Sequence, residues 1–547
     1  MVSAKFRKEK IMSWIKRDGS KTVEEIIKRN TGLTASDFLN SAVESSVTNA
    51  YECALAIEDA ILEDKPITII GDYDADGITA ASILYLTLNH FQIVPKVRFP
   101  KRFSEGYGIS DKMIDEIDEG VLITVDNGIA AHDCIKKAKE KGLSTIIIDH
   151  HLFEGSLPEA HIIVNPHVIG NDDFKDYCGA GLAYKICKEI LLRSNKSARY
   201  TVIKQIKALA AIGTVADVVP LIKENRKIVI EGMEEINSGN VTNGLSALLK
   251  IMKVSKVDEG TIGYNLAPII NASGRLNDNG ALLVFKLLAS NSNDKEKLEA
   301  VAEKLISINN ERKTLVSEAI EKANEIYSED IAPAIILNIP EINEGIIGII
   351  AGKLAETYKK PCVIFSNSKE EGFLKGSGRS YGNIHLKKLL DMCSEFLYKY
   401  GGHSGAAGMT VSKENYSDFK MCFINALISK YGNIEFKDEY YDLDINPEDV
   451  NQVYEEVLKY APYGEGNEPI LFKINNFEGK DGYSNKYRVL GDEHIKIIGK
   501  HNDALAFGLY DKFIPLAEEK SWNLIGDMYE NTFNGITSIQ IKVRDFV

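Results

Sequence analysis

The sequence predicts an α/β protein with a parallel-sheet lobe, a long connecting helix, a second α/β lobe and a C-terminal β-barrel. Between about residues 45 and 230, continuous apolar runs alternate with amphipathic helical stretches, which is typical of a parallel sheet covered on both faces. Residues 293–328 carry one apolar stripe at helical spacing and so predict a single long helix. Beyond residue 467, short strand signals separated by turns predict a small antiparallel barrel.

The expected elements divide the 547 residues into five segments. Three of these, the two lobes and the barrel with its linker, are long enough to be domains, and this length suggests three or four domains. The first segment is a small helical lead-in, because apolar residues recur at helical spacing, first Ile11, Trp14 and Ile15 and then Val23, Ile26 and Ile27. Residues 434–450 are acidic and are expected to act as a linker. The expected strands lie at 67–70, 121–125, 145–148, 333–337, 362–365, 487–490, 495–498, 504–507 and 536–543. The boundaries are 1–40 for the lead-in, 41–290 for the first lobe, 291–330 for the connecting helix, 331–435 for the second lobe, and 436–547 for the linker and barrel.

The composition excludes several classes of protein. At 44% hydrophobic residues the chain is too apolar to be disordered, and it has no run of ~18 apolar residues that would predict a membrane span. The basic residues after Met1 are not followed by an apolar segment, so a secretory signal is not expected. The seven cysteines are widely spaced without a CxxC pair, which favours a cytoplasmic protein lacking disulfides and zinc. With a formal charge of −14, any binding of nucleic acid must use local basic surfaces or metals held by carboxylates.

Acids follow three of the expected strands. The first strand is followed by Asp72, Asp74 and Asp76, which share one face if the backbone stays extended. The second is followed by Asp126 and the third by Asp149-His150-His151. Ligands of open α/β sheets bind beyond the carboxyl ends of the strands, so these side chains are expected to converge. A fourth acid, Asp217, lies between apolar residues and is expected to be partly buried.

Such a group of carboxylates favours a centre for two divalent metals. Without metal the carboxylates would repel one another, and most would be protonated. Carboxylates with imidazole suit Mn²⁺, and a more oxygen-rich set suits Mg²⁺. Two ions about 4 Å apart, bridged by one carboxylate, activate a water molecule and stabilise the leaving oxygen of a phosphoryl transfer.

Each of these residues also has a simpler explanation when taken alone. Asp-x-Asp-x-Asp-Gly opens EF-hand loops, but here a strand precedes it and position twelve is Ile83 instead of Glu. Asp126 or Asp149 could be a helix N-cap, and a lone buried histidine is usually structural. Four acidic positions with two adjacent histidines in one α/β unit favour the metal centre.

These residues resemble the motifs of the DHH phosphoesterase superfamily, which is named after the triplet at 149–151. Asp74-x-Asp76, Asp126, the triplet and Asp217 match its four motifs in order. Residues 401–408, Gly-Gly-His-Ser-Gly-Ala-Ala-Gly, resemble the DHH-associated (DHHA1) domain. Within the superfamily the chain is most similar to the bacterial single-strand-specific 5′→3′ exonucleases, through residues 71–77, 102–108, 271–276 and 462–467. The resemblance runs from about residue 36 to the C-terminus and implies that the barrel is an OB-fold.

The resemblance implies a role for each matching position. The implied metal ligands are Asp74, Asp76, Asp126, His150 and Asp217, with Asp126 as the bridge and Asp72 as a ligand or a supporting acid. The implied catalytic set is Asp126, His151 at the scissile phosphate or leaving oxygen, and Asp149 orienting the histidines. The implied contacts to substrate phosphates are Arg102, Arg275, Ser377, Arg379, Gly402 and His403. Arg312, on the apolar stripe of the long helix, is interpreted as packing through its stem.

The implied function is a single-stranded-DNA-specific 5′→3′ exonuclease of DNA repair and recombination, which releases 5′-mononucleotides with two Mn²⁺ or Mg²⁺ ions. A helicase and a single-strand-binding protein are implied partners, and nothing demands more than a monomer. Two alternatives stay open. A DHH phosphodiesterase of short oligonucleotides or cyclic dinucleotides would have no evident use for the barrel, and a non-catalytic replication scaffold would have lost metal ligands.

One segment departs from the family pattern. The family usually has Trp-His before the Gly-x-Ile-Gly of the second lobe, whereas this chain has residues 341–344, Glu-Ile-Asn-Glu. Any substrate contact that the missing aromatic ring or imidazole makes is expected to be absent.

Overall fold

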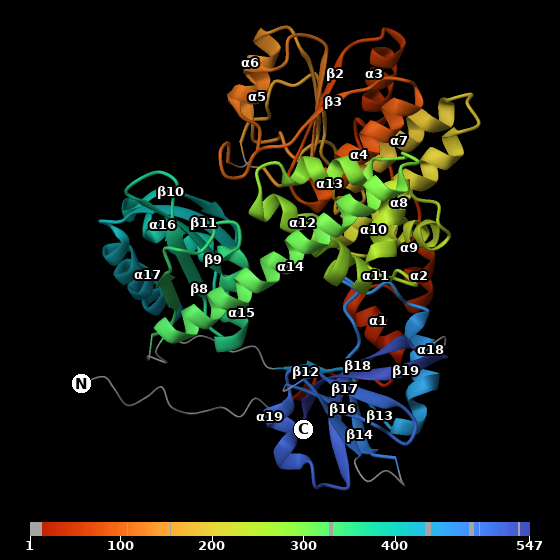
Figure 1. The fold of residues 1–547 in the computed structure, drawn as a ribbon, viewed down its shortest axis with the longest axis vertical. Coiled ribbons are helices and arrows are strands. Elements are labelled where there is room, and N and C mark those ends of the chain that lie inside the picture. The colour runs from red at the N-terminus through yellow and green to blue at the C-terminus, as the bar shows by residue number, and fades with distance from the viewer. Residues whose placement is uncertain are drawn as a thin grey trace. The chain divides into compact units, whose positions relative to one another are not determined.

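The computed structural model describes residues 14–106, 108–153, 155–327, 332–432, 439–480, 486–491, 493–533 and 536–547 (Figure 1). These residues form two compact units. The first unit comprises residues 45–217 and 228–432, and the second unit comprises residues 14–44, 218–227 and 439–547. Within the described ranges, no helix combines the length and apolar character needed to cross a bilayer.

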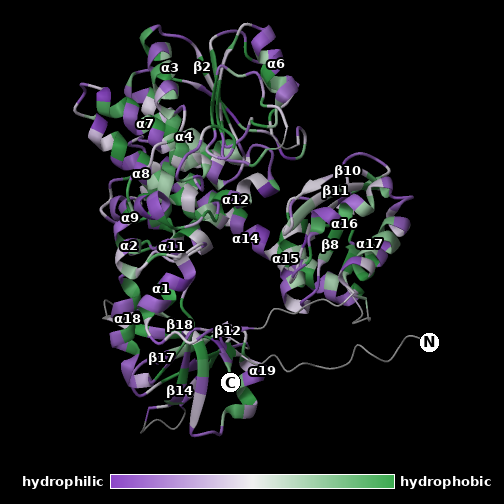
Figure 2. Cartoon of the chain, turned by 180° about the vertical axis from the view of Figure 1, so that it is seen from behind, coloured by the Kyte–Doolittle hydropathy of each residue, from purple (hydrophilic) through white to green (hydrophobic). Residues whose placement is uncertain are grey.

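The first unit begins with a parallel sheet of five strands in the order β3-β2-β4-β5-β6. Its central strands are buried along their length, with Ile123 opposite both Ile69 and Ile146. Parallel strands need crossover connections, and in Figure 2 the strands near β2 are hydrophobic whereas helix α6 is largely hydrophilic. The predicted parallel α/β lobe is therefore confirmed. Its elements are α3 (Ala50–Leu62), β2 (Ile67–Gly71), α4 (Ala75–His90), β3 (Lys96–Arg98), α5 (Asp111–Asp115), β4 (Val121–Val125), α6 (His132–Glu140), β5 (Ser144–Ile148), β6 (Ile162–Val164) and α7 (Gly179–Arg193).

A helical layer follows and ends in the long helix α14 (Lys295–Ile326), which confirms the helix predicted over 293–328. Asp294 caps α14 by accepting a hydrogen bond from the Lys297 N–H at 3.1 Å. The C-terminal half of its buried stripe, with Val316 and Ala319, belongs to the core of the following lobe. The helices before it are α8 (Arg199–Ala216), α9 (Lys223–Asn237), α10 (Asn243–Ile251), α11 (Glu259–Thr261), the π-helix η1 (Ile262–Leu266), α12 (Ala267–Leu276) and α13 (Gly280–Leu288).

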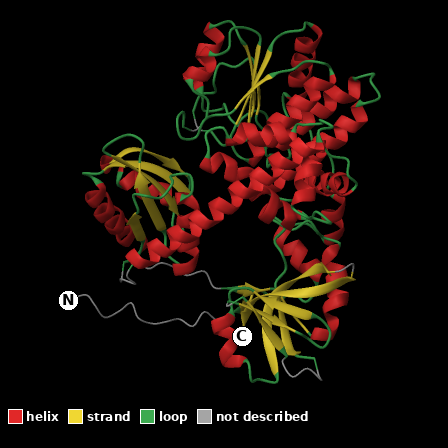
Figure 3. Ribbon diagram, viewed as in Figure 1, coloured by secondary structure: helices red, strands yellow, loops and turns green. Residues whose placement is uncertain are grey.

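The second lobe of the first unit is built on a mixed five-stranded sheet in the order β10-β11-β9-β8-β7. Only β7 and β8 run parallel, and the other pairs are antiparallel. Figures 1 and 3 show α15 on one side of this sheet and α17 on the other. The elements are β7 (Ile335–Asn338), α15 (Ile347–Tyr358), β8 (Cys362–Asn367), β9 (Phe373–Arg379), α16 (Leu386–Met392), η2 (Ser394–Phe396), β10 (Leu397–Gly402), β11 (Ala406–Ser412) and α17 (Tyr416–Tyr431).

The second unit contains a seven-stranded sheet in the order β13-β14-β18-β19-β17-β16-β15. The barrel was expected to be antiparallel, but β13 runs parallel to β14 and β17 runs parallel to β19, while the other pairs are antiparallel. Its core joins Phe472 and Trp522 of the sheet to Ile26, Ile27 and Phe38 of the N-terminal helices. These residues come from opposite ends of the chain, so the N-terminal segment is part of the C-terminal unit. The elements are β1 (Ile15–Lys16), α1 (Val23–Thr31), α2 (Ala35–Asn40), β12 (Tyr440–Tyr441), β13 (Leu443–Ile445), η3 (Pro447–Asp449), α18 (Val450–Leu458), β14 (Phe472–Glu478), β15 (Tyr487–Leu490), β16 (His494–Ile497), β17 (Asp503–Ala506), α19 (Tyr510–Phe513), η4 (Ile514–Leu516), β18 (Ser521–Phe533) and β19 (Ile536–Phe546).

Two local predictions are wrong. The helical lead-in is confirmed only in part. Helix α1 carries Val23, Ile26 and Ile27 on its buried face. The helix expected through Trp14 and Ile15 is absent, because β1 pairs with β12 as a short parallel ladder; Ile11 lies outside the described residues. The linker expected over 434–450 is structured from residue 439 onward, and the rest lies outside the described residues. The reason is Asp442, which is buried and held by the Arg29 guanidinium at 2.7 Å and by the Leu471 N–H at 2.9 Å. An acid with such partners belongs to a core, and the local sequence does not reveal those partners.

Candidate metal centre and phosphate site

The strand-end acids meet at one edge of the parallel sheet. Asp72 follows β2, Asp126 follows β4 and Asp149 follows β5, and these three strands are neighbours. Asp74 is the N-cap of α4, where its carboxylate accepts from the Gly77 N–H at 3.1 Å. Asp217 reaches the same place as the residue that ends α8.

The predicted ligands form three overlapping groups, and in each the ligand atoms lie within 4.8 Å of one another. Asp126 belongs to two of these groups. Its carboxylate lies 3.1 Å from His150 Nε2, which lies 3.6 Å from the carboxylate of Asp217. Asp126 thus stands between the imidazole of His150 and the acids that follow β2, Asp72 and Asp74, which is the position that a bridging ligand needs. The groups are Asp72 with Asp74 and Asp126; Asp76 with His150 and Asp217; and Asp126 with His150 and His151.

The electrostatics of this cluster suit divalent cations. Burial, together with the neighbouring Asp74, raises the pKa of Asp72 to about 8. Burial and the charge of Asp76 raise the pKa of Asp217 to about 9 and that of Asp126 well above its ordinary value. These carboxyl groups are therefore costly to ionise together, and cations among them would remove that cost. An oxygen-rich donor set with one buried imidazole fits Mn²⁺ or Mg²⁺.

Asp149 organises the histidines and does not face the other acids. One of its oxygens accepts from the backbone N–H of His150 at 2.8 Å and lies 2.8 Å from His151 Nδ1, while the other accepts from the Ile129 N–H. Burial opposes ionisation of Asp149, but these bonds hold its pKa below the ordinary value. The same pairing outweighs burial at His151 and raises its pKa to about 9. His151 is therefore held by Nδ1, while burial lowers the pKa of His150.

Asp76 depends on a segment that the sequence did not single out. Its two carboxylate oxygens accept from the N–H groups of Gly179 and Ala180, at 2.6 and 2.8 Å, at the start of α7. A Cβ on Gly179 would lie 2.6 Å from the Cβ of Asp126, so only glycine allows α7 to approach so closely. The small residues of Gly179-Ala180-Gly181 at a helix start were the available signal, and the contact itself spans more than a hundred residues.

Replacing Gly179 with alanine is expected to displace Asp126 and Asp76 and to weaken metal binding at least tenfold. The basis is that residues supporting a ligand typically contribute 10–100-fold to metal affinity. The measurement is the Mn²⁺ concentration that half-saturates each protein in a calorimetric titration. Gly181→Ala is the matched control, because a Cβ there meets atoms only at ordinary contact distances of 3.5 Å and more. Equal Mn²⁺ requirements in the two variants would contradict the prediction.

Four arginines gather beside Asp74. Arg275 lies in the last turn of α12. Burial and the charges of Arg102, Arg312 and Arg379 lower the pKa of Arg275 to about 10. The guanidinium of Arg102 lies 5.2 Å from the centre of the Tyr73 ring. Arg312 is half-buried and donates from Nε to Asn309 at 3.1 Å, and its charge acts on Arg275. We call Arg102, Arg275, Arg312 and Arg379 the arginine cluster; so many cations together suit a bound polyanion.

Ser377 and Arg379 lie on β9 against the first turn of α15. Arg379 Nη1 donates to Ser377 Oγ at 3.2 Å, and a Cβ on Gly348 would lie 3.0 Å from both side chains. The first N–H groups of a helix attract anions, so this end of α15 adds donors for phosphate. Burial lowers the pKa of Arg379.

The structure places Gly402 at the end of β10 and His403 on the exposed turn that follows it. Gly402 has φ of +139°, and a Cβ there would lie 2.4 Å from the carbonyl oxygen of Ala406. His403 Nδ1 accepts from the Gly405 N–H at 3.2 Å, and Ala406 pairs with Arg379 across the sheet. This turn is therefore next to the strand end that carries Arg379, and in the described part of the chain it makes no contact with the metal ligands.

Residues 341–344, which depart from the family pattern, contribute to the structure of the second lobe. Ile342 is buried in the core beside α15, and the Asn343 side chain accepts from the Gly345 N–H at 2.8 Å. Ile342 and Asn343 thus stabilise the approach to α15, where the family has Trp and His.

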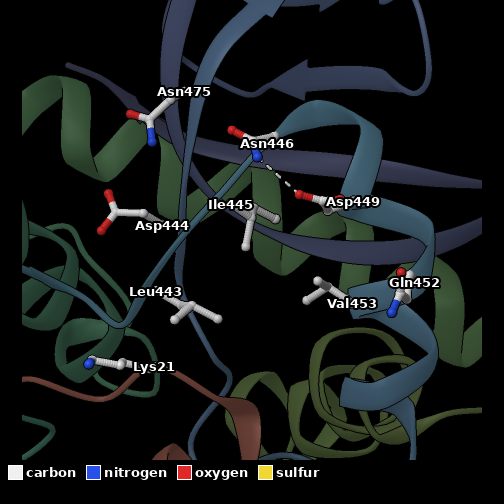
Figure 4. A pocket seen from close by; sticks show the side chains of 9 residues that line it. All are labelled: Lys21, Leu443, Asp444, Ile445, Asn446, Asp449, Gln452, Val453 and Asn475. Carbon is white, nitrogen blue, oxygen red and sulfur yellow. Dashed lines mark hydrogen bonds between the residues drawn. The ribbon is translucent and has the colours of Figure 1, made fainter.

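A separate pocket in the second unit contains none of these residues (Figure 4). Its volume is about 320 Å³. The Asn446 side chain donates to Asp449 at 3.1 Å, as Figure 4 shows, and Lys16 pairs with Asp444 at 3.0 Å, so the acids of the pocket are already engaged. The lining residues are Lys21, Leu443, Asp444, Ile445, Asn446, Asp449, Gln452, Val453 and Asn475.

Comparison with known proteins identifies the family. Three family models match: the DHH family N-terminal domain at residues 66–214, the DHHA1 domain at 332–430 and the RecJ OB domain at 441–545. The single-stranded-DNA-specific exonuclease RecJ of Haemophilus influenzae is 30% identical over 520 residues, covering 89% of this chain and 88% of that protein. The chain belongs to the RecJ family. RecJ of Bacillus subtilis is 31% identical over 510 residues, and the match spans 90% of this chain but 63% of that longer protein.

Solved structures of RecJ share the fold. RecJ of Thermus thermophilus in complex with Mn²⁺ superposes with a TM-score of 0.79 at 27% identity, over 95% of this chain and 75% of that chain. Its complex with Mg²⁺ gives a TM-score of 0.74. The predicted architecture of a DHH lobe, a DHHA1 lobe and an OB-fold barrel is therefore confirmed.

Proposed function

We propose that the protein is a single-stranded-DNA-specific exonuclease that hydrolyses phosphodiester bonds from the 5′ end with two divalent metal ions. The observation that carries this proposal is that a cluster of metal-binding carboxylates and a cluster of arginines meet at Asp74. One cluster suits the chemistry of phosphate ester cleavage, and the other suits the binding of a terminal phosphate. Membership of the RecJ family supports the choice of single-stranded DNA as the substrate.

The residues of the metal centre take distinct roles in this proposal. Asp72, Asp74, Asp76, Asp126, His150 and Asp217 would hold the ions, with Asp126 shared between the two sets of ligands. When bound there, Mn²⁺ or Mg²⁺ ions would supply a nucleophilic water and neutralise charge on the leaving oxygen. Asp149 fixes the orientation of His151, and His151 Nε2 donates to the scissile phosphate or the leaving oxygen.

The arginine cluster would bind and orient the 5′ end. Arginine suits this because its planar fork donates two parallel hydrogen bonds to one phosphate. Ser377 and the first turn of α15 lie beside Arg379 and add uncharged donors. A phosphate held there would leave the next phosphodiester bond within reach of the metal centre, which accounts for mononucleotide products.

Two alternative functions fit the structure and the comparisons less well. A phosphodiesterase of short oligonucleotides or cyclic dinucleotides would use the same metal centre, but it offers no reason for the RecJ OB domain at residues 441–545. A non-catalytic scaffold would have lost metal ligands, whereas every expected ligand position here carries a ligating residue. From the family resemblance we also propose that the protein is a cytoplasmic monomer. We propose that it acts in DNA repair and recombination, with a helicase and a single-strand-binding protein as partners.

The test of this function is the digestion of an internally labelled, 5′-phosphorylated single strand with Mn²⁺. Parallel substrates carry a blocking group at the 5′ or the 3′ end. Mononucleotides that disappear only with the 5′ block would support the proposal. Cleavage of dinucleotides while long strands survive would favour the short-substrate phosphodiesterase. Equal cleavage of duplex and single strand would contradict the proposed specificity for single strands.

Replacing Arg275 with alanine is expected to raise KM for a 5′-phosphorylated strand about 10–100-fold. The basis is that a hydrogen bond to a charged group contributes about 1.5–3 kcal/mol. The increase should be smaller for a strand with a 5′-hydroxyl, because the lost contact is to the terminal phosphate. Arg193→Ala is the matched control, since Arg193 also lies in the last turn of a helix but pairs with Glu58 at the surface. An equal loss on both strands would contradict the assignment of Arg275 to the 5′ phosphate.

A further inference from the structure

The helical stretch formed by η1 and α12 is buried except along one stripe. From Leu266 to Arg275, only Pro268, Asn271 and Arg275 are not buried. These positions are three and four residues apart, so they lie on one face of the helix. Tyr264 continues this face, four residues before Pro268, and is 80% exposed. We call Tyr264, Pro268, Asn271 and Arg275 the α12 stripe.

One end of the α12 stripe lies beside the phosphate site and the metal ligands. Arg275 belongs to the arginine cluster, and the charge of Asp74 acts on it. One turn earlier, the side-chain oxygen of Asn271 accepts from the Ala75 N–H at 2.8 Å. Ala75 stands between the ligands Asp74 and Asp76 in the sequence, so Asn271 lies against the turn that carries both.

The other end of the stripe lies near a different metal ligand. A Cβ on Gly263, the residue before Tyr264, would lie 3.7 Å from the Val215 side chain. Val215 is in the last turn of α8, two residues before Asp217. Asp217 belongs to a different ligand group from Asp74. The stripe thus extends from the arginine cluster, past the turn of the metal ligands, to the neighbourhood of Asp217.

The spacing along the stripe matches equal steps of a strand. Asn271 is four residues from Arg275, about 6 Å at 1.5 Å per residue, and Tyr264 is eleven residues from Arg275, about 16 Å. In the proposed function the terminal phosphate binds at Arg275 and the next phosphate at the metal centre, beside Asn271. A further step of the same length ends about 12 Å from Arg275. The third nucleotide of a strand along the stripe would therefore lie next to Tyr264.

Tyr264 has the character of a platform for a base. Because the residue is 80% exposed, its ring contributes little to the core of the lobe. Exposed aromatic rings bind single strands by stacking on bases, whatever their sequence. The ring is carried by a π-helix, a rare element that is frequent at functional sites. Pro268, one turn away on the same face, adds apolar surface beside it.

We propose that Tyr264 stacks on the base of the third nucleotide from the 5′ end and holds the strand on the 3′ side of the bond that is cut. This inference rests on the proposed exonuclease function. The strand ends at the arginine cluster, passes the metal centre and leaves along the α12 stripe. Every base has a face that can stack, so the contact would be renewed after each cut, whichever base comes next.

The first test places one abasic nucleotide at the second, third, fourth or fifth position of a 5′-phosphorylated strand of about twelve nucleotides. For the unaltered protein, KM for release of the 5′ nucleotide should rise about tenfold with the third position abasic, and less with the others. Tyr264→Ala should raise KM about tenfold on the intact strand and abolish the effect of the third position. Tyr264→Phe should behave like the unaltered protein, because stacking needs the ring and not the hydroxyl.

The second test uses a 5′-phosphorylated dinucleotide, which has no third base, so its KM should be the same for Tyr264→Ala and the unaltered protein. Tyr200→Ala is the matched control, because Tyr200 is also exposed but lies in the first turn of α8, at the opposite end from Val215. The inference is overturned if Tyr264→Ala loses as much on the dinucleotide as on the longer strand, or if it keeps the effect of the third position. Failure of the proposed function would look different, because the unaltered protein would then not digest long single strands at all.

Discussion

Replacing Asp126 with alanine is expected to lower kcat/KM for single-stranded DNA on the order of 10³-fold or more at saturating Mn²⁺. Asp126 lies in two of the three ligand groups, with its carboxylate 3.1 Å from His150 Nε2, so its loss removes the proposed bridge. Metal ions contribute several kcal/mol of charge stabilisation in a transition state, and each 1.36 kcal/mol is a factor of ten in rate. The measurement is the release of mononucleotides from an internally labelled strand.

The controls separate a lost ligand from a lost fold. Asp126→Asn keeps the size of the side chain and removes a charge that burial and Asp76 make costly, so its thermal midpoint in EDTA should be no lower than that of the unaltered protein. Asp133→Ala removes an exposed acid from the first turn of the neighbouring helix α6 and should retain full activity. An Asp126→Asn protein with more than a tenth of normal activity would contradict the bridging role.

The metal-free protein is expected to lose stability as the pH rises from about 4 to 9, by several kcal/mol, and to regain it when Mn²⁺ is added. The carboxyl groups of Asp72 and Asp217 have pKa values of about 8 and about 9 in the folded protein, against an ordinary value of 3.8. The folded state therefore binds more protons than the unfolded state between these limits, so the free energy of unfolding falls as pH rises. His151, whose pKa is raised to about 9, acts in the same direction above neutral pH. A pKa that differs by one between the folded and unfolded states changes the free energy of unfolding by about 1.4 kcal/mol.

Urea unfolding of the first unit in EDTA at pH 5, 7 and 8.5, repeated with Mn²⁺, measures this dependence. Asp149 contributes in the opposite sense, because its pKa is lowered, but that stability is lost only at acid pH. Asp217→Asn should flatten the profile in EDTA and reduce the gain from Mn²⁺, since bound ligand stabilises in proportion to the logarithm of its concentration over Kd. A free energy of unfolding that rises with pH in EDTA would show that these carboxyl groups are not crowded as the structure has them.

The convergence of the strand-end acids could be predicted because it follows from the rules of parallel sheets. Apolar strands without alternation predict a buried parallel sheet, and the carboxyl ends of such strands meet at one edge. Asp72, Asp126 and Asp149 each directly follow such a strand, so their proximity needed no knowledge of distant contacts. The long helix α14 could be predicted for a similar reason, since its apolar stripe is a local pattern.

What the sequence could not predict depends on contacts between distant residues. The support of Asp76 by the N–H groups of Gly179 and Ala180 is a backbone contact, and the small residues at the start of α7 do not show which distant acid they contact. Arg312 looked like a packing residue because its neighbours on α14 are apolar, and only the fold shows Arg275 nearby. The acidic stretch around Asp442 resembled a linker because its buried partner Arg29 comes from the other end of the chain.

The second unit combines N-terminal and C-terminal segments, and this affects the order in which the protein folds during synthesis. Trp14 donates a hydrogen bond to Asp545, a residue 531 positions later. At about 5–20 residues per second, translation takes roughly 25–110 s to supply that partner. Throughout this time Ile26, Ile27 and Phe38 lack the barrel residues that bury them, so the nascent chain exposes a small apolar surface near its start. The first unit can fold in the meantime, whereas the second unit can only form after synthesis of the barrel, so residues 14–44 complete their packing last.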